Sequence, residues 1–299
     1  MSVILAGTLT WVTVTFLPGD AATRILGPHV TPERLHDLRI RLGLDRPILD
    51  QYLDWLTGLF TGNLGTSAIS GESVTGLVLT RLGNSAALAG IVAVLALTVG
   101  ITIGTLIGRQ RRGRAFSNAG LLGASAVPDF VIGAIAVGLL AVSWRLVPSL
   151  SVIPPFGHVF SRPQILVIPV LAMGVPVTIW VARYTSAAVS RVAGAPHVRA
   201  ARRMGIPEFR VITRHILPVA LAPMIQLFGW MASILIGSTV IVEQLVQFPG
   251  IGSLLIEAVG DRDLPVATAV VTVLAAVVAV TIYFCDLLAA RLDPRMVTR

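Results

Sequence analysis

Asp129 is the acidic side chain that lies deepest inside an apolar run of this sequence, about ten residues into the run and next to Pro128. A carboxylate at membrane depth is costly, and such residues usually mark a path for a substrate or an ion. Asp129 is therefore a candidate partner for a cationic group of a substrate, such as an amine. The alternative is structural: the carboxylate pairs with an arginine at a helix end, or accepts a hydrogen bond beside the proline.

Few other residues could do chemistry. All 23 basic residues are arginine, so the chain cannot form the phosphate-binding loop G-x-x-x-x-G-K-[ST] or a lysine Schiff base. The lone Cys285 excludes an internal disulfide and a cysteine-based metal cluster. The five histidines lack metal-ligand spacing, and neither H-E-x-x-H nor G-x-S-x-G occurs. We therefore expect no catalytic, metal-binding or cofactor-binding residue in this chain.

The stretch PHVRAARRMGIPEFRVITRHILP, residues 196–218, combines arginines with helix-start and helix-stop signals. Pro196 is placed to open a short helix that Gly205 ends, and Pro207 to open a second helix that Pro218 closes. Two adjacent alanines leave one side of the first helix nearly bare. We predict that a partner protein docks here, on Pro196, Arg199, Ala200, Ala201, Arg202, Arg203 and Gly205. The alternative is a solvated basic loop.

The composition predicts an integral membrane protein. The chain is 55% hydrophobic and 13% charged, with a mean hydropathy of +0.83. Apolar runs near the ~20 residues needed to cross a bilayer are expected at about 1–18, 84–108, 119–142, 164–184, 219–242 and 264–288. The prolines at 128, 169 and 176 are expected to bend these helices without breaking them.

The first run would be only about 27 Å long as a helix and lacks a charged flank. Either the chain starts inside this helix, or the helix is short and tilted. A cleaved signal peptide is disfavoured because no basic residues precede the run.

Arginine counts set the expected orientation, since basic residues in short loops stay in the cytoplasm. The segment 183–218 carries seven arginines against Glu208 alone, and 109–114 carries four without an acid. The segment 20–81 balances six arginines with seven acids and is expected outside. Both termini are then cytoplasmic.

The expected organisation is a first membrane helix at 1–18, an extracytoplasmic segment of short amphipathic helices at 19–83 and a five-helix membrane core at 84–288. A cytoplasmic loop at 190–218 interrupts this core, and a cytoplasmic tail follows at 289–299. Thr31 is a candidate helix cap before Pro32, and Asn84 and Ser85 are candidate caps of the second span.

Several motifs together resemble the permease subunits of ATP-binding-cassette importers for dipeptides, oligopeptides and nickel. The resemblance runs nearly end to end and is to the first of the two related membrane subunits. It rests on LPGD at 17–20, RLGLDRP at 41–47 with Gln51, Tyr52 and Trp55, GNLGTS at 62–67, Val242-Glu243, FPGIG at 248–252, Arg262-Asp263 with Pro265, and LDPR at 292–295.

This resemblance implies a type I importer fold with six membrane helices and a coupling loop for an ATPase. In the family, the loop reads E-A-A, three residues, G. Here Arg199 replaces the glutamate, followed by Ala200-Ala201 and, three residues later, Gly205. The implied partners are a second homologous permease subunit, two ATPase subunits that bind ATP and magnesium, an extracytoplasmic binding protein and membrane lipid. The implied location is the inner membrane of a prokaryote.

The resemblance also directs attention to two further sets of residues. Polar residues of the fifth span are candidates for the path, together with Asp129: Gln226, Ser233, Ser238 and Thr239. Candidates for docking the binding protein are Asp20, Trp55, Glu243, Phe248, Pro249, Gly250, Arg262 and Asp263. A packing role for the Phe248-Pro249-Gly250 turn is equally compatible with the sequence.

The net charge of +8 follows from the loop arginines and favours anionic lipid rather than nucleic acid. A self-sufficient secondary transporter or channel is the rival class, and the paired intramembrane charges or interrupted repeats that it needs are not evident. The resemblance implies peptide as the substrate, with nickel or a metal chelate as the alternative.

Overall fold

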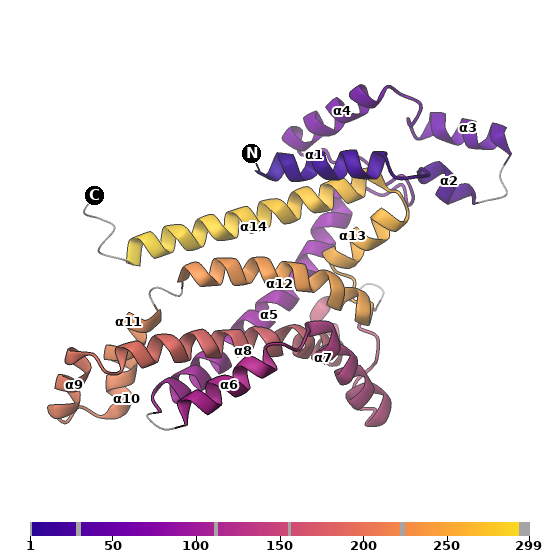
Figure 1. The fold of residues 1–299 in the computed structure, drawn as a ribbon. Helices are drawn as coiled ribbons and strands as arrows, with labels where there is room; N and C mark the ends of the chain where they lie inside the picture. The colour runs from indigo at the N-terminus through magenta and orange to yellow at the C-terminus, as the bar shows by residue number, and fades with distance from the viewer. Residues whose placement is uncertain (1, 28–30, 111–112, 155–156, 222–224, 293–299) are drawn as a thin grey trace. The chain divides into compact units, whose positions relative to one another are not determined.

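The computed structural model describes residues 2–27, 31–110, 113–154, 157–221 and 225–292. Their regular structure is helical, and the β pairing found among them is an isolated bridge between Thr66 and Ser73 (Figure 1). The predicted all-α class is confirmed.

Short helices precede the first long one. α1 spans Ser2–Thr15 and α2 spans Ala21–Leu26. α3 spans Pro32–Arg41 and α4 spans Ile48–Thr61, as expected of the segment 19–83. Thr31 is the N-cap of α3 with Pro32 at its first position, although the Thr31 side chain makes no capping hydrogen bond.

α5 begins at Val74 and continues to Gly108, so it starts ten residues earlier than predicted. The prediction that Asn84 and Ser85 cap this helix is wrong, because both lie within it. Their side chains bind the turn after residue 248 instead: Asn84 Nδ2 donates to the Pro249 carbonyl over 2.8 Å, and Ser85 Oγ accepts from the Ile251 amide over 2.8 Å. These two polar side chains therefore connect α5 to the turn at residues 249–251 instead of capping a helix.

The third predicted span is broken rather than bent. α6 spans Arg114–Ala124, α7 spans Asp129–Ala136 and a π-helix follows at Val137–Ser143, with an 80° bend between α6 and the rest. Pro128 is the extended N-cap of α7, because proline has no amide hydrogen and disfavours a helical residue before it. The expectation that Pro128 would only bend the helix is therefore wrong.

Of the remaining long helices, α8 and α14 are longer than predicted and α12 is slightly shorter. After two 3₁₀ turns, Val159–Ser161 and Pro163–Leu166, α8 spans Val167–Val192 and keeps Pro176 inside it, as expected. Four short helical segments form the loop described below. α12 spans Ile225–Val246, α13 spans Ile251–Gly260 and α14 spans Leu264–Leu292. The first four residues of the predicted tail, 289–292, belong to α14, and the rest of it, 293–299, lies outside the described residues.

Three described helices are long and apolar enough to cross a membrane: Val74–Gly108, Pro163–Val192 and Leu264–Arg291. The count rises to five if the bent pairs 114–124 with 129–143 and 233–246 with 251–260 are each one span. The predicted first span is a shorter apolar helix, Ser2–Thr15. Six spans remain a prediction.

The chain forms two compact units. The first contains Met1–Ala86 and Pro249–Ala279, and the second contains Ala87–Phe248 and Val280–Arg299. The predicted segments 1–18 and 19–83 both belong to the first unit, and the predicted core 84–288 is divided between the two. Within the second unit, α8 packs against α6, α7, α11 and α12 (Figure 1).

Glycines spaced by four residues bring α5 close to α8 within the second unit. A Cβ on Gly100 would lie 2.7 Å from Val181, and a Cβ on Gly108 would lie 2.8 Å from the Ser186 carbonyl. At Gly104 it would lie 2.5 Å from the Ala182 carbonyl. Small residues at such spacing allow two membrane helices to approach closely.

We expect Gly104→Ala to destabilise the protein by about 1–2 kcal/mol, since the added methyl group forces two backbones apart. Gly90→Ala is the matched control, because Gly90 lies on the same helix with no atom within 4 Å of an added Cβ. It should be neutral or stabilising by up to about 1 kcal/mol, as expected for alanine in a helix. Unfolding in detergent, followed by circular dichroism, measures both; a Gly104→Ala protein as stable as Gly90→Ala would contradict the close approach.

Candidate functional site

The arginine-rich loop begins as the sequence predicts. α9 spans Pro196–Arg203, with Pro196 at its first position and Ala195 as an extended N-cap. Met204 is the C-cap, and Gly205 follows with φ +75°, in the left-handed region that favours glycine. The predicted helix start and the predicted glycine stop are confirmed.

The second half of the loop differs from the prediction. Pro207 is the N-cap of α10, Glu208–Val211, but the chain stays helical through a π-helix, Ile212–Ile216, and through α11, Leu217–Leu221. Pro218 is the second residue of α11, so the prediction that it closes the helix is wrong. The wider π turn lies where proline would clash with the carbonyl four residues earlier, which explains how the helix passes it.

The two alanines of α9 do not form one bare side. Ala201 is 1% exposed and packs with the buried Val198, Val211 and Ile216, whereas Ala200 is exposed. The predicted bare surface of both alanines is therefore corrected, because adjacent residues of a helix point about 100° apart. Ala201 anchors α9, and Ala200 remains available to a partner.

Arg202 is not a free surface charge either. Its Nε and Nη2 donate to the two carboxylate oxygens of Glu208 over 3.1 and 2.8 Å, and its Nη1 donates to the Ala193 carbonyl over 3.1 Å. Bidentate arginine–carboxylate pairs are among the stronger side-chain contacts. Arg202 therefore links α9 to α10 through Glu208, and to the end of α8 through Ala193.

Glu208, the single acid of the basic segment, also approaches Arg109, just beyond α5, with Nε–Oε1 at 3.8 Å. Its hydrogen bond with Arg202 lowers the pKa of the Glu208 carboxyl against the opposing effect of burial, and the Arg109 charge lowers it further. A lowered carboxylate pKa gives a stabilisation that is complete above the ordinary glutamate range and is lost as pH falls through the lowered value. The pair is therefore ionised at neutral pH.

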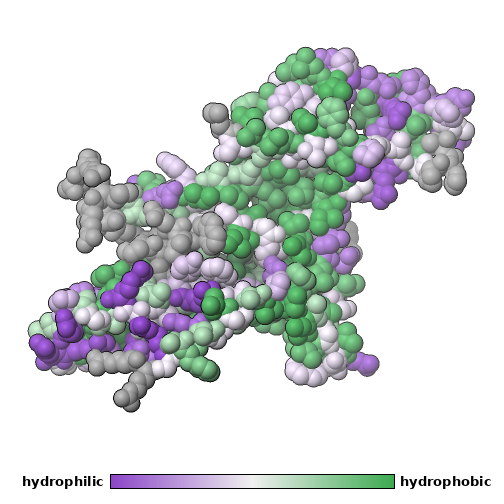
Figure 2. Space-filling model, in the orientation of Figure 1, coloured by the Kyte–Doolittle hydropathy of each residue, from purple (hydrophilic) through white to green (hydrophobic). Residues whose placement is uncertain are grey.

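The exposed face of the loop is basic with two apolar side chains. Arg199 and Arg203 are exposed, and Met204 and Phe209, on either side of the Gly-Ile-Pro turn, are 72% and 79% exposed. Figure 2 shows hydrophilic side chains gathered over α9 and α10. Sequence reasoning missed Met204 and Phe209, although two large apolar residues flanking a turn in a basic loop are a usable signal.

Asp129 and Ser238, both predicted on the path, are in contact. The Ser238 hydroxyl donates to Asp129 Oδ2, joining α12 to the start of α7, and the Phe130 amide donates to Asp129 Oδ1 over 2.8 Å. Asp129 is half-buried, and the described residues include no arginine paired with it. Of the two structural alternatives, the hydrogen bond beside the proline is the one found.

The hydroxyl groups of two other path candidates already donate to carbonyls of their own helix, so they are less available to a substrate in this conformation. Thr239 is 4% exposed and its hydroxyl donates to the Leu235 carbonyl of its own helix over 2.7 Å. Ser233 donates to the Gly229 carbonyl over 3.3 Å. The side chain of Gln226 lies outside the described residues.

Half of the predicted docking residues are packed inside the protein. Those buried are Glu243, Phe248, Gly250 and Asp263. Asp263 accepts a 2.5 Å hydrogen bond from Ser67 Oγ, which explains its burial. For these four residues the docking prediction is corrected, because a buried side chain offers no surface to a partner; the packing alternative holds for the Phe248 turn.

The remaining docking candidates are at least partly exposed: Asp20, Trp55, Pro249 and Arg262. Asp20 caps α2 through the Thr23 amide at 2.9 Å and pairs with Arg39 Nε at 2.7 Å. Burial opposes ionisation of Asp20, but the Thr23 and Arg39 contacts outweigh it and lower its pKa. Asp20 therefore links α2 to α3 within the first unit.

Comparison with known proteins decides the family. The family described as "Binding-protein-dependent transport system inner membrane component" matches residues 96–298, and its N-terminal companion family matches residues 1–99. The chain belongs to this family. The permease is thus a multi-pass inner-membrane component and not itself a catalyst.

Curated relatives are similar over nearly their whole length. The permease is 32% identical to a peptide permease protein of Brucella ovis over 297 residues, covering 96% of this chain and 92% of the relative. It is 30% identical to a peptide transport system permease protein of Brucella abortus, covering 98% and 94%. It is also 30% identical to the oligopeptide transport system permease protein AppB of Bacillus subtilis, covering 96% and 93%.

Proposed function

We propose that this permease forms half of the translocation path of an ATP-driven importer of di- or oligopeptides. A second homologous permease supplies the other half, an extracytoplasmic binding protein delivers the peptide, and two ATPase subunits hold ATP and magnesium. The names of the relatives from Brucella and Bacillus support peptide as the substrate. Both termini and the 196–218 loop then lie in the cytoplasm.

The observation that carries the proposal is the attachment of the loop to two long helices. Val198 and Ala201 of α9 pack with Val189 of α8, while Glu208 approaches Arg109 at the end of α5. The close approach of α5 and α8 at Gly104 makes these helices a common support. A force applied to α9 is therefore passed to both helices rather than absorbed by a flexible loop.

A rigid attachment of this kind suits alternating access. An importer needs two packings of similar energy, and a partner shifts the balance only if it binds one packing better. Closure of the ATPases on ATP would favour the packing whose loops fit the closed pair. The exposed Arg199, Ala200, Arg203 and Met204 are the surface that we assign to the ATPase.

Copurification tests the proposed assembly. Mild detergent extraction of the permease from its native membrane should retain two ATPase subunits and a second permease. Isolation of the permease alone, under conditions that keep other membrane complexes intact, would count against it.

We expect Asp129→Asn to lower uptake of peptides with a free amino terminus by about tenfold, since a charge-assisted contact contributes roughly 1.5–3 kcal/mol. Ser238→Ala separates the hydroxyl from the charge: it removes the hydroxyl donor but leaves the carboxylate charged, so uptake should fall less than in Asp129→Asn. Transport of labelled peptide is measured at matched expression. Unaltered uptake by Asp129→Asn would remove Asp129 from the path.

A further inference from the structure

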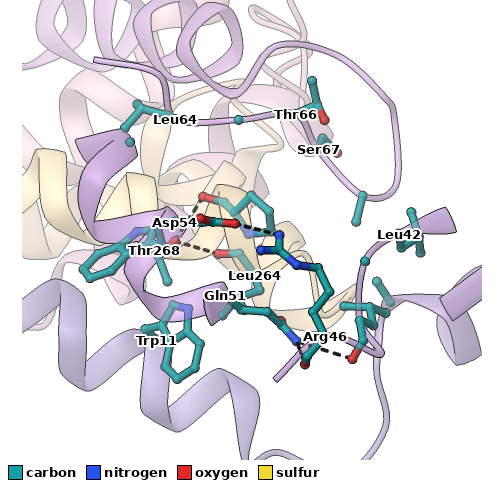
Figure 3. Close-up of a pocket in the computed structure, with 18 of the residues that line it drawn as sticks. Trp11, Leu42, Arg46, Gln51, Asp54, Leu64, Thr66, Ser67, Leu264 and Thr268 are labelled. Atoms are coloured by element: carbon teal, nitrogen blue, oxygen red, sulfur yellow. Dashed lines mark hydrogen bonds and ion pairs between the residues drawn. The ribbon is translucent and has the colours of Figure 1, made fainter. Parts of the chain in front are cut away.

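A cavity of about 560 Å³ lies within the first unit, beside α4 and the start of α14 (Figure 3). Three motifs of the family resemblance meet in its wall: the RLGLDR stretch, the GNLGTS stretch and the Arg262–Pro265 turn. Its volume is in the range of small-molecule sites, about 300–1,000 Å³. Residues far apart in the sequence thus build one hollow.

The charged groups of the wall favour an anion. Arg46 Nη1 pairs with Asp54 Oδ2 at 2.6 Å, and these two side chains face each other in Figure 3. Asp54 is the single acid among the lining residues, which also include Arg41 and Arg262. Within the described part of the chain, neither of these two arginines forms an ion pair. Two positive charges are therefore left without a counter-charge.

Arg262 is held in an uncommon backbone conformation. Its φ is +61°, in the left-handed region that few residues other than glycine adopt, and its side chain is anchored by a 3.0 Å hydrogen bond from Nη1 to the Val259 carbonyl. Residues kept in such conformations cluster at functional sites. The turn and this hydrogen bond together fix Arg262, which lines the cavity.

Trp55 adds a fixed aromatic ring to the lining of the cavity. Its indole Nε1 is buried and has no hydrogen-bond partner among the described residues. The ring is fixed by contact with α1, where a Cβ on Gly7 would lie 2.8 Å from Trp55 Cζ2, and by Tyr52, 5.6 Å away between ring centroids. Because this nitrogen is closed off from the cavity as well, Trp55 contributes a rigid aromatic surface and not a donor.

We propose that this cavity binds the carboxyl-terminal end of a short peptide, with Arg262 as the main partner of the carboxylate. The inference rests on the proposed function and adds a site where a peptide is held before it enters the path. Arg41 is a further donor, and the apolar Trp11, Leu64 and Leu264 suit the last side chain. Because Asp54 is already paired with Arg46, the amino end of the peptide is not recognised.

The test is equilibrium binding of the dipeptide Ala-Phe to the detergent-purified transporter complex, without the binding protein. We expect saturable binding of Ala-Phe, at least tenfold weaker binding of its carboxyl-terminal amide, and unchanged binding of its N-acetyl form. No binding, or equal affinity of the acid and the amide, would overturn the proposal.

Variants locate the site. Arg262→Gln and Arg262→Gly should each weaken Ala-Phe binding at least tenfold; the glycine variant relieves the backbone strain and so guards against misfolding. Arg24→Gln is the control, because Arg24 pairs with Asp261 on the same unit and is not among the lining residues. Wild-type affinity in both Arg262 variants would refute the site.

Two further outcomes separate the possibilities. If the Arg262 variants weaken only capture of the binding protein and leave Ala-Phe affinity unchanged, the cavity receives a protein side chain and the proposal is wrong. ATP-driven peptide uptake by the complete system without Ala-Phe binding would refute the cavity site but keep the proposed function. Binding at Arg262 without any ATP-driven uptake would refute the proposed function instead.

Discussion

Gly205→Val should reduce ATP-driven uptake at least tenfold while the transporter still assembles and hydrolyses ATP. Gly205 has φ +75°, and a Cβ there would have no atom within 4 Å, so the substitution acts through backbone strain and not through a clash. The left-handed conformation costs an ordinary residue about 1–2 kcal/mol, and a β-branched residue avoids it most strongly. The turn that sets α9 against α10 would therefore reform differently.

Two variants control this prediction. Gly194→Val places the same side chain in the loop just before α9, where φ is not in the left-handed region and an added Cβ also has open space; it should transport normally. Gly205→Asn should keep most of the uptake, since asparagine tolerates the left-handed region. Uptake and ATPase activity are measured on the same proteoliposomes. Wild-type uptake by Gly205→Val would show that the turn does not couple the two activities.

Arg202→Ala should uncouple the transporter by a different route, with uptake lowered about tenfold relative to ATP hydrolysis. The change removes both hydrogen bonds to Glu208 and the bond to the Ala193 carbonyl. Glu208 keeps only the longer 3.8 Å approach of Arg109. Removing one partner of such a pair costs about 1–3 kcal/mol, which weakens the attachment of α9 to α10 and leaves only their apolar packing.

The matched control is Arg191→Ala, which removes the same charge from the last turn of α8, at an exposed position that forms no ion pair among the described residues. Its ratio of uptake to hydrolysis should equal that of the wild type. Glu208→Gln keeps an acceptor but loses the charge, so it should fall between the two. A wild-type ratio of uptake to ATP hydrolysis in Arg202→Ala would show that the ion pair is not needed for coupling.

Local chemistry made part of the loop predictable. Pro196 at a helix start and Gly205 in a left-handed turn follow from backbone rules that act over a few residues. The Arg202–Glu208 pair was not predicted, because two residues six apart meet only after the turn between them has formed. The inward side of Ala201 likewise depends on the orientation of α9 relative to α8.

The sequence predicted the presence of the apolar helices more accurately than it predicted where they end or where they break. Hydropathy located the apolar runs, but it could not show that α5 starts at Val74 or that Pro128 breaks its span. Asn84 suits a cap by propensity, yet its amide binds the Pro249 carbonyl in the structure. Tertiary contacts of this kind override local preference, and the cavity at Arg262 depends on them entirely.

Reconstituted transport tests the central claim most directly. The permease, with its copurifying subunits and its binding protein, is placed in proteoliposomes, and uptake of a labelled oligopeptide is measured with and without ATP on the ATPase side. We predict uptake that requires ATP and the whole assembly, and none by the isolated permease. Uptake by the permease alone, without ATP and at the rate of the complete system, would contradict the account.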